Sequence, residues 1–262
     1  MFSVRTQPKM FPCVLAAMLL FGATATAQIA TTTGVPMTLN GSAKLLTGTK
    51  GGTGLLLTPA QEYLAGSAFT TNAVTFGSTY AFRTFFQFAM TRPGGIAPAD
   101  GMAFVLQTAG ATALGVNGGD LGYGGITPSV AVEFDTYQNG WDADDNHVAI
   151  LTDGQMIDID SQTPYGVTNC TPSTGVFGCM SNGDVWSVWI DYDGTTLNVS
   201  LADNSTTRPP ASISYPIDIA TTLGQSSASV GFTAGTGGGW QTHAIFDWSF
   251  SQTQSSTVSE ER

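Results

Sequence analysis

The sequence has 262 residues and carries 8 basic against 19 acidic side chains, for a net charge of −11 with histidine neutral. An acidic balance of this size argues against nucleic acid and anionic membranes as partners. The length suits one large all-β domain as well as two small ones. No internal repeat and no clear linker divides the chain.

The first 27 residues have the pattern of an export signal. Arg5 and Lys9 precede a short apolar run at 11–21, and Ala25–Ala27 matches a small-residue cleavage site. The run is too short to span a membrane. We therefore expect a signal peptide at 1–27, cleaved near Ala27, secretion to the extracellular or periplasmic space, and no membrane insertion.

Short runs rich in Val, Ile, Thr, Phe and Trp then alternate with clusters of Gly, Asn and Asp, as in strands joined by turns. This pattern predicts an all-β fold, an antiparallel β-sandwich, over residues 28–250. We expect the glycine-rich stretch 110–125 to be a long flexible connection and the polar segment 251–262 to be a flexible tail. The runs lie at 80–90, 102–107, 130–137, 147–151, 185–192, 196–201, 228–232 and 243–250.

Two cysteines, Cys170 and Cys179, follow the export signal and lie in a stretch rich in Pro, Ser and Gly. Export makes a disulfide between them the expected state. It would close a short loop and contribute roughly 3 kcal/mol on the chain-entropy model.

The segment from Glu133 to His147 carries the strongest chemical signal. Glu133 and Asp135 are two residues apart and share one face of a strand, while Phe134 points to the other face, toward a core. The two carboxylates repel each other, and a bound cation removes that repulsion. Asn139, Asp142 and His147 follow within a few residues. Oxygen ligands suit calcium, and an imidazole added to carboxylates suits manganese, zinc or a similar ion. The pattern therefore predicts a two-cation site.

The order and spacing of these residues resemble the L-type (legume-type) lectins, over nearly all of the chain that follows the export signal. Residues 130–139 look like the metal-binding strand of that family, and Trp141-Asp142 and Asn146-His147 continue it. The resemblance implies a concanavalin A-like jelly-roll sandwich and a non-catalytic, metal-dependent carbohydrate-binding protein. The signal peptide and the glycine-rich stretch 121–126 point to a secreted bacterial member. Further similar segments are the aspartate turn 99–104, the glycine loop 118–122 and the strands at 188–192 and 240–250.

The resemblance also implies how two metal ions would be held. Glu133, Asp135, Asp142 and His147 would bind Mn²⁺ or another transition ion. Asp135, the Tyr137 carbonyl, Asn139 and Asp142 would bind Ca²⁺. Asp144 and Asp145 have no counterpart in the family pattern, and we expect them to face solvent.

The sugar site implied by the resemblance is centred on Asp100, whose carboxylate would accept hydrogen bonds from two sugar hydroxyls. In the family the peptide bond before this aspartate, here Ala99–Asp100, is cis. Gly119 would donate its backbone N–H, Asn139 its side-chain amide, and Tyr137 would stack on the sugar.

The loop 233–240 resembles the specificity loop of the family. It is short and almost without side chains, which makes the backbone N–H groups of Gly238 and Gly239 the expected donors. We expect Trp240 to begin the next strand rather than to contact ligand.

Two alternatives compete with a lectin. Some glucanases with a jelly-roll fold carry Glu-x-Asp-x-(x)-Glu on one strand, and Glu133-x-Asp135 begins that pattern, but Tyr137 and Gln138 stand where the last glutamate belongs. The other alternative is a structural or adhesive domain whose cations only fix loops. For the lectin we expect glycans or glycoconjugates as partners, and the sequence leaves a homo-oligomer open.

Overall fold

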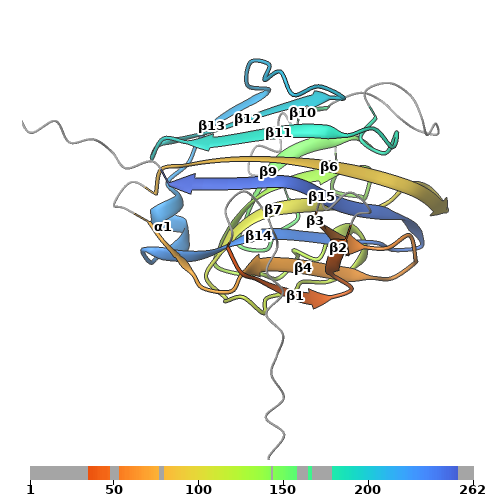
Figure 1. Ribbon diagram of the computed structural model, residues 1–262, viewed down its shortest axis with the longest axis horizontal. Coiled ribbons are helices and arrows are strands. Elements are labelled where there is room, and N and C mark those ends of the chain that lie inside the picture. Colours follow the sequence, from red (N-terminus) through yellow and green to blue (C-terminus); the bar gives the residue numbers. More distant parts are fainter. Residues whose placement is uncertain are drawn as a thin grey trace, which may run out of the picture.

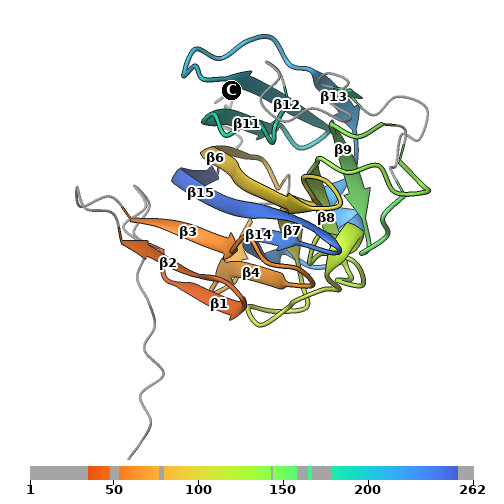
Figure 2. The ribbon, with the colours of Figure 1, turned by 90° about the vertical axis from the view of Figure 1, so that its right-hand side faces the viewer.

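Two antiparallel sheets packed face to face form the computed structural model of the protein (Figure 1). The structure describes residues 35–47, 53–76, 80–142, 144–157, 165–166 and 179–252. The predicted signal peptide, Cys170 and residues 253–262 lie outside these ranges. The expectation of an antiparallel β-sandwich is confirmed, and Figure 2 shows the two layers from the side.

One sheet has eight strands, in which β5 (Val74–Thr75) pairs with β14 beside the main path. The order of that path is β1 (Met37–Gly41), β4 (Ala65–Thr70), β14 (Ser227–Gly235), β7 (Gly101–Gln107), β8 (Ser129–Asp135), β9 (His147–Thr152) and β10 (Tyr165–Gly166).

The other sheet has seven strands. Its order is β13 (Ile213–Pro216), β12 (Thr196–Asp203), β11 (Trp186–Tyr192), β6 (Phe82–Gly95), β15 (Gly239–Gln252), β3 (Thr53–Thr58) and β2 (Lys44–Thr47). Strand β15 runs two residues past the predicted domain end at 250.

Helix is almost absent from the described residues. A five-residue helix, α1 (Ile219–Leu223), is capped by the Asp218 side chain, and a 3₁₀ turn, η1 (Gly118–Asp120), lies in the glycine-rich stretch. No helix in this part of the chain is long and apolar enough to cross a membrane.

Aromatic side chains fill the space between the sheets. Along β6, Phe82, Phe86 and Phe88 alternate with more exposed residues and point inward. Phe86 meets Phe232 of the opposite sheet with ring centroids 4.9 Å apart. Removing such a buried ring costs about 3–5 kcal/mol, so these strands hold the sheets together.

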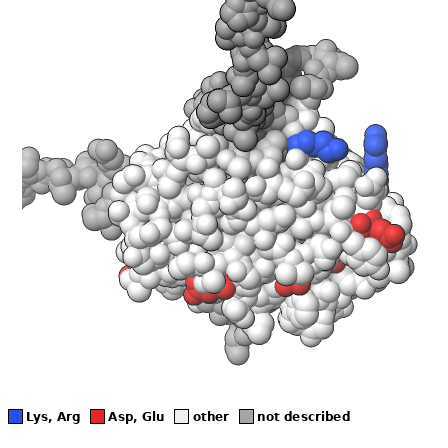
Figure 3. Space-filling view, turned by 90° about the horizontal axis from the view of Figure 1, so that it is seen from below, with Lys and Arg blue, Asp and Glu red and all other residues white. Residues whose placement is uncertain are grey.

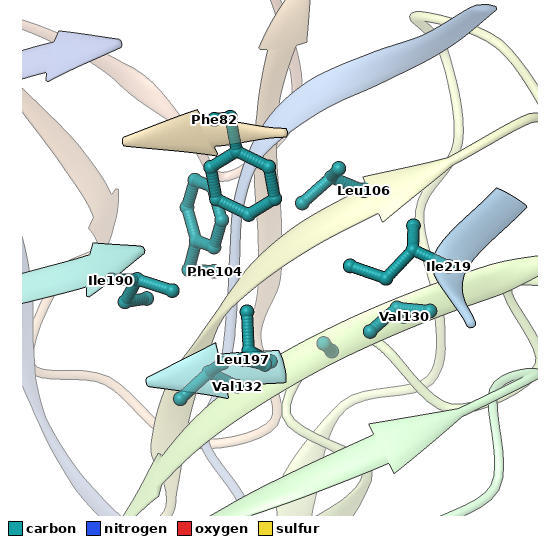
Figure 4. A pocket seen from close by; sticks show the side chains of 9 residues that line it. Phe82, Phe104, Leu106, Val130, Val132, Ile190, Leu197 and Ile219 are labelled. Atoms are coloured by element: carbon teal, nitrogen blue, oxygen red, sulfur yellow. The ribbon is translucent and has the colours of Figure 1, made fainter. Parts of the chain in front are cut away.

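Packing between the sheets leaves a small void of about 10 Å³, lined by apolar side chains of both sheets and by Ile219 of α1 (Figure 4). The void has no polar lining to hold water or ligand. We assign it to the core.

The glycine-rich stretch corrects the expectation of a flexible connection. It folds back over the outer face of β7 and β8, where Tyr123 and Ile126 pack against Ala131 and Leu151. Glycine is required there for close approach, since a Cβ on Gly115 would lie 2.6 Å from the Gly124 carbonyl oxygen. All seven residues of β8 are therefore buried, on both faces of the sheet.

Charged side chains are sparse on the surface of the protein. Figure 3 shows a face on which a few acidic and basic groups lie near the margins and most of the area is uncharged. This agrees with a charged fraction of 10% in the sequence.

Candidate functional site

One row of paired residues crosses the eight-stranded sheet and positions the candidate site. Gly235 of β14 pairs with Gly101 of β7, Gly101 pairs with Asp135 of β8, and Asp135 pairs with His147 of β9. The loops that precede or follow these residues are therefore brought to the same end of the sheet. They include Asp100, Asn139 and Gly237.

The acidic cluster lies on the outer face of this sheet, as its alternation predicts. Val132 and Phe134 belong to the interior core. On the other face, Glu133, Asp135 and His147 each offer a ligand atom, and these three atoms lie within 4.8 Å of one another. None of the three residues is more than 1% exposed, and His147 Nε2 is 3.3 Å from Glu133 Oε1.

This cluster shifts the pKa of its members strongly. Burial, followed by the charge of Glu133, raises the pKa of Asp135 well above its usual range. Burial alone would lower the pKa of His147, but its hydrogen bond to Glu133 and the nearby carboxylates raise it to about 10. Buried acids that need a positive partner are the expected environment of a cation site.

The ring of His147 is oriented by a residue that sequence reasoning missed. Nδ1 lies 3.2 Å from the Asp144 carbonyl oxygen, so the proton on Nδ1 is donated there and Nε2 faces Glu133. Asp144 Oδ1 in turn accepts the Asn146 backbone N–H at 3.0 Å. The expectation that both neighbouring acids face solvent is wrong for Asp145, which is 9% exposed. Both precede β9, and Asp144 folds back against His147.

Within the described part of the chain, three buried oxygen atoms at this end of the sheet have no hydrogen-bond partner: Asp135 Oδ2, Asn139 Oδ1 and Asp100 Oδ2. The other oxygen of Asp135 accepts the Tyr137 N–H at 2.7 Å, and Asp142 Oδ2 accepts the Asn139 N–H at 2.6 Å. Leaving buried acceptors unsatisfied costs about 1–3 kcal/mol each. Carboxylate and carboxamide oxygens are the ligands that calcium takes. The residues present therefore fit the predicted ions, with Glu133 and His147 on the transition-ion side and Asn139 on the calcium side.

Asp100 lies beside this cluster and is 4% exposed. The peptide bond Ala99–Asp100 is cis, as the resemblance implies. Burial raises the pKa of Asp100, a hydrogen bond from the Gly237 backbone partly opposes this, and the charges of Asp120 and Asp142 add to the rise, so that the pKa is about 6. The carboxylate is thus positioned as an acceptor at a site that can hold a polar ligand.

Gly119 and Asn139, which are both predicted to bind sugar, lie in contact with each other. A Cβ on Gly119 would lie 2.4 Å from Asn139 Oδ1 and 2.7 Å from Nδ2, so any larger residue would displace the Asn139 carboxamide. The glycine loop and the loop after β8 therefore pack directly against each other.

The loop between β14 and β15 contributes a residue that the sequence did not single out. A Cβ on Gly237 would lie 3.2 Å from Asp100 Oδ2. The predicted donors follow it: Gly238 is partly exposed, whereas Gly239 is buried and pairs with Gly95 of β6. The indole of Trp240 lies against Gly94, whose Cβ would be 2.5 Å from its Nε1, which favours the structural role for Trp240.

A buried chain of hydrogen bonds supports Asp100 from the interior. The Asp100 carbonyl oxygen accepts from Thr136 Oγ1 at 2.7 Å and from Thr136 N at 2.9 Å. Gln241 Nε2 donates to Thr136 Oγ1 at 2.7 Å and lies 3.2 Å from His243 Nε2. His243 Nδ1 is 2.6 Å from Thr58 Oγ1. Sequence reasoning missed this chain because its members come from two strands, β3 and β15, and from two loops, and they form no local motif.

Comparison with known proteins identifies the family. The model of the legume lectin domain matches residues 31–262. The chain belongs to the legume lectin family. A receptor kinase of Arabidopsis thaliana, "L-type lectin-domain containing receptor kinase I.8", is 33% identical over 84% of this chain and 34% of its own length. A seed lectin of Styphnolobium japonicum is 33% identical over 68% of this chain and 59% of its own length. The chain thus spans about a third of the receptor kinase.

Solved legume lectins share the architecture. Basic winged bean lectin with Tn-antigen is similar at a TM-score of 0.66 and 27% identity, covering 83% of this chain and 93% of that one. Peanut lectin gives a TM-score of 0.67 at 26% identity, covering 84% and 93%. The jelly-roll sandwich of the lectins is therefore the fold of this chain.

Family membership decides against the glycoside hydrolase alternative, because legume lectins bind carbohydrate without cleaving it. The geometry agrees with this. Glu133, which begins the hydrolase-like pattern, is 1% exposed and contacts His147 rather than a ligand cleft.

Proposed function

We propose that this lectin domain binds glycans through a shallow pocket organised by Ca²⁺ and by Mn²⁺ or another transition ion. One observation carries the proposal: the buried oxygens without partners on Asp135 and Asn139, at and just after the end of β8, gather at one end of the sheet with that of Asp100, from the loop before β7. A purely structural cation site would not leave Asp100 with free acceptor capacity beside it.

The residues would divide the work as follows. Glu133, Asp135, Asp142 and His147 would hold the transition ion, and Asp135, Asn139, Asp142 and the Tyr137 carbonyl would hold calcium. The ions supply fixed positive charge that orders these side chains. Asp100 accepts hydrogen bonds from sugar hydroxyls, Gly119 and Asn139 donate, Tyr137 presents its ring, and the loop at Gly237–Gly239 closes the pocket.

The relatives support carbohydrate as the ligand. The similar winged bean structure holds Tn-antigen, and an acidic winged bean lectin that is 27% identical holds methyl-α-D-galactose. Because loops differ between relatives, the monosaccharide preference of this chain has to be measured and cannot be inferred from theirs.

A glycan array probed in Ca²⁺ and Mn²⁺, and again after exhaustive chelation, tests the proposal. Chelation should abolish binding and lower the melting temperature together, because an ion that binds only the folded state stabilises it. Glycan binding that persists after chelation would refute the role of the ions.

The variant Asp100→Asn separates the pocket from the fold. It should reduce glycan affinity below detection while leaving the melting temperature of the ion-loaded protein near that of the wild type. The exposed Asp247→Asn, in the opposite sheet, is the matched control for loss of one charge. Full affinity in the Asp100 variant would show that the pocket has been assigned to the wrong residues.

Three further features stay predictions of the sequence. They are secretion after cleavage near Ala27, a bacterial source, although the relatives reported above come from plants, and a Cys170–Cys179 disulfide. Mass spectrometry of the exported, unreduced protein tests the cleavage site and the disulfide, and sedimentation tests for a homo-oligomer.

A further inference from the structure

Two large apolar side chains are exposed beside the loop that closes the proposed pocket. Tyr63 is 63% exposed and Ile96 is 72% exposed. A Cβ built on Gly238 would lie 3.6 Å from Tyr63 Oη and 3.9 Å from Ile96 Cδ1. Single exposed hydrophobic residues are common, but these two flank the same residue of the same loop.

Both residues are held against that loop by main-chain hydrogen bonds. The Tyr63 N–H donates to the Gly237 carbonyl oxygen at 3.2 Å, and the Ile96 N–H donates to that of Gly238 at 3.3 Å. Asn117, which precedes the glycine loop, donates its side-chain amide to the Tyr63 carbonyl oxygen at 2.9 Å. Their backbones are therefore fixed while their side chains remain in solvent.

The conformation of Tyr63 is unusual for an aromatic residue. Its φ is +55°, in the left-handed region that non-glycine residues seldom occupy. Backbone strain of this kind tends to collect at functional sites. Here it places an aromatic ring beside the proposed pocket instead of in the core.

The loop connects this apolar pair to Asp100. Gly237 lies against Asp100 Oδ2, and Gly238, the next residue, lies against Tyr63 and Ile96. Consecutive Cα atoms are about 3.8 Å apart. A sugar ring held by Asp100 would therefore have the apolar pair within reach of a substituent.

We propose that Tyr63 and Ile96 form a second subsite, which binds the apolar C–H face of a second sugar ring joined to the one at Asp100. This inference rests on the proposed carbohydrate-binding function and deepens it, because it makes the preferred ligand a glycan of at least two units. Tyrosine suits this task, since it offers a flat apolar face and a polar tip.

The test compares one-ring and two-ring probes on the full chain loaded with Ca²⁺ and Mn²⁺. A glycan array of methyl monosaccharides and of disaccharides that carry them as terminal units selects the best-bound pair. Calorimetry then measures both members of the pair, together with the p-nitrophenyl glycoside of the same sugar, against Tyr63→Ala and Ile96→Ser. The aryl glycoside shows whether the subsite takes any apolar group or requires a second sugar ring.

We expect disaccharide affinity to fall about tenfold in Tyr63→Ala, while methyl monosaccharide affinity stays within about twofold of the wild type. Tyr63→Phe should keep most of the disaccharide affinity. Ile157→Ser is the matched control for Ile96→Ser, because Ile157 is 64% exposed and lies beyond the opposite end of β9.

Equal losses for both probes, or no loss for either, would overturn the subsite while leaving the pocket at Asp100 intact. Absence of any binding by the wild-type protein would overturn the proposed function itself. Ile96→Ser decides the matter if Tyr63→Ala does not fold.

Discussion

The chain has two histidines, and the structure buries both completely yet shifts their pKa values in opposite directions. His147 on β9 has its pKa raised to about 10, whereas burial lowers the pKa of His243 on β15 to about 3. The surroundings make the difference. His147 faces Glu133 and Asp135, while His243 contacts the neutral side chains of Thr58 and Gln241.

The comparison shows that burial alone does not identify a functional histidine. Both rings are oriented by a hydrogen bond at Nδ1, to the Asp144 carbonyl oxygen for His147 and to Thr58 for His243. Only His147 presents its Nε2 to a carboxylate cluster, where one cation could bind all three side chains. His243 presents its Nε2 to an amide, and it therefore supports the pocket from the interior.

The variant Asp135→Asn should have the largest effect, on ion affinity, because it removes a carboxylate from the surroundings of His147. Asp135 faces His147 across the strands and offers an oxygen without a partner. Loss of a supporting residue around a metal typically costs about 10- to 100-fold in affinity, and loss of this ligand should exceed that for both ions. Calorimetry with Mn²⁺ and with Ca²⁺ measures it, and glycan binding should fail in parallel. Unchanged affinity for both ions would remove Asp135 from the site.

The variant Gln241→Leu should have the next largest effect, on stability, since it removes a neutral partner of His243. It leaves Thr136 and His243 without their shared partner, and a buried group left unsatisfied costs about 1–3 kcal/mol. Denaturant unfolding should show that loss in the free energy of unfolding, with ion affinity retained. Gln225→Leu, at an exposed position, is the control. Equal stability of the two variants would show that the hydrogen-bond chain contributes nothing.

Over a single pH unit, the dependence of stability on pH should give the smallest effect, and it sharpens the comparison. The folded-state pKa of His243 lies below the ordinary value of 6.5, so between about pH 6.5 and 3 only the unfolded chain takes up this proton. The free energy of unfolding therefore falls with falling pH, by about 1.4 kcal/mol per pH unit from this group. His243→Gln should have a shallower slope than the wild type in ion-saturated buffer. Identical slopes would contradict the lowered pKa.

Local alternation was sufficient to predict one face of β8. The spacing of Glu133 and Asp135 placed them together, and Phe134 was correctly assigned to the core. The prediction that Asp100 and Gly119 share a site with Asn139 came from the family resemblance and not from spacing, because contacts between loops leave no periodic signal in the sequence.

Other features could not be read from the chain. Gln241 and Thr136 are 105 residues apart, and their pairing depends on how β15 faces the loop after β8. A glycine-rich stretch can be either flexible or closely packed, and the sequence does not distinguish the two. Only the structure shows that this stretch covers the outer face of the sheet. The burial of Asp145 follows from the turn that leads into β9, which composition does not reveal.

The row from Gly235 to His147 has a consequence for how such a domain can diversify. The residues of this row are paired by backbone hydrogen bonds between strands, which restricts change in them. The loops that they connect can differ in length and in side chains from one such domain to another. The selectivity for glycans can therefore change through loop positions such as Tyr63 and Ile96, while the sheet and the proposed ion ligands stay unchanged.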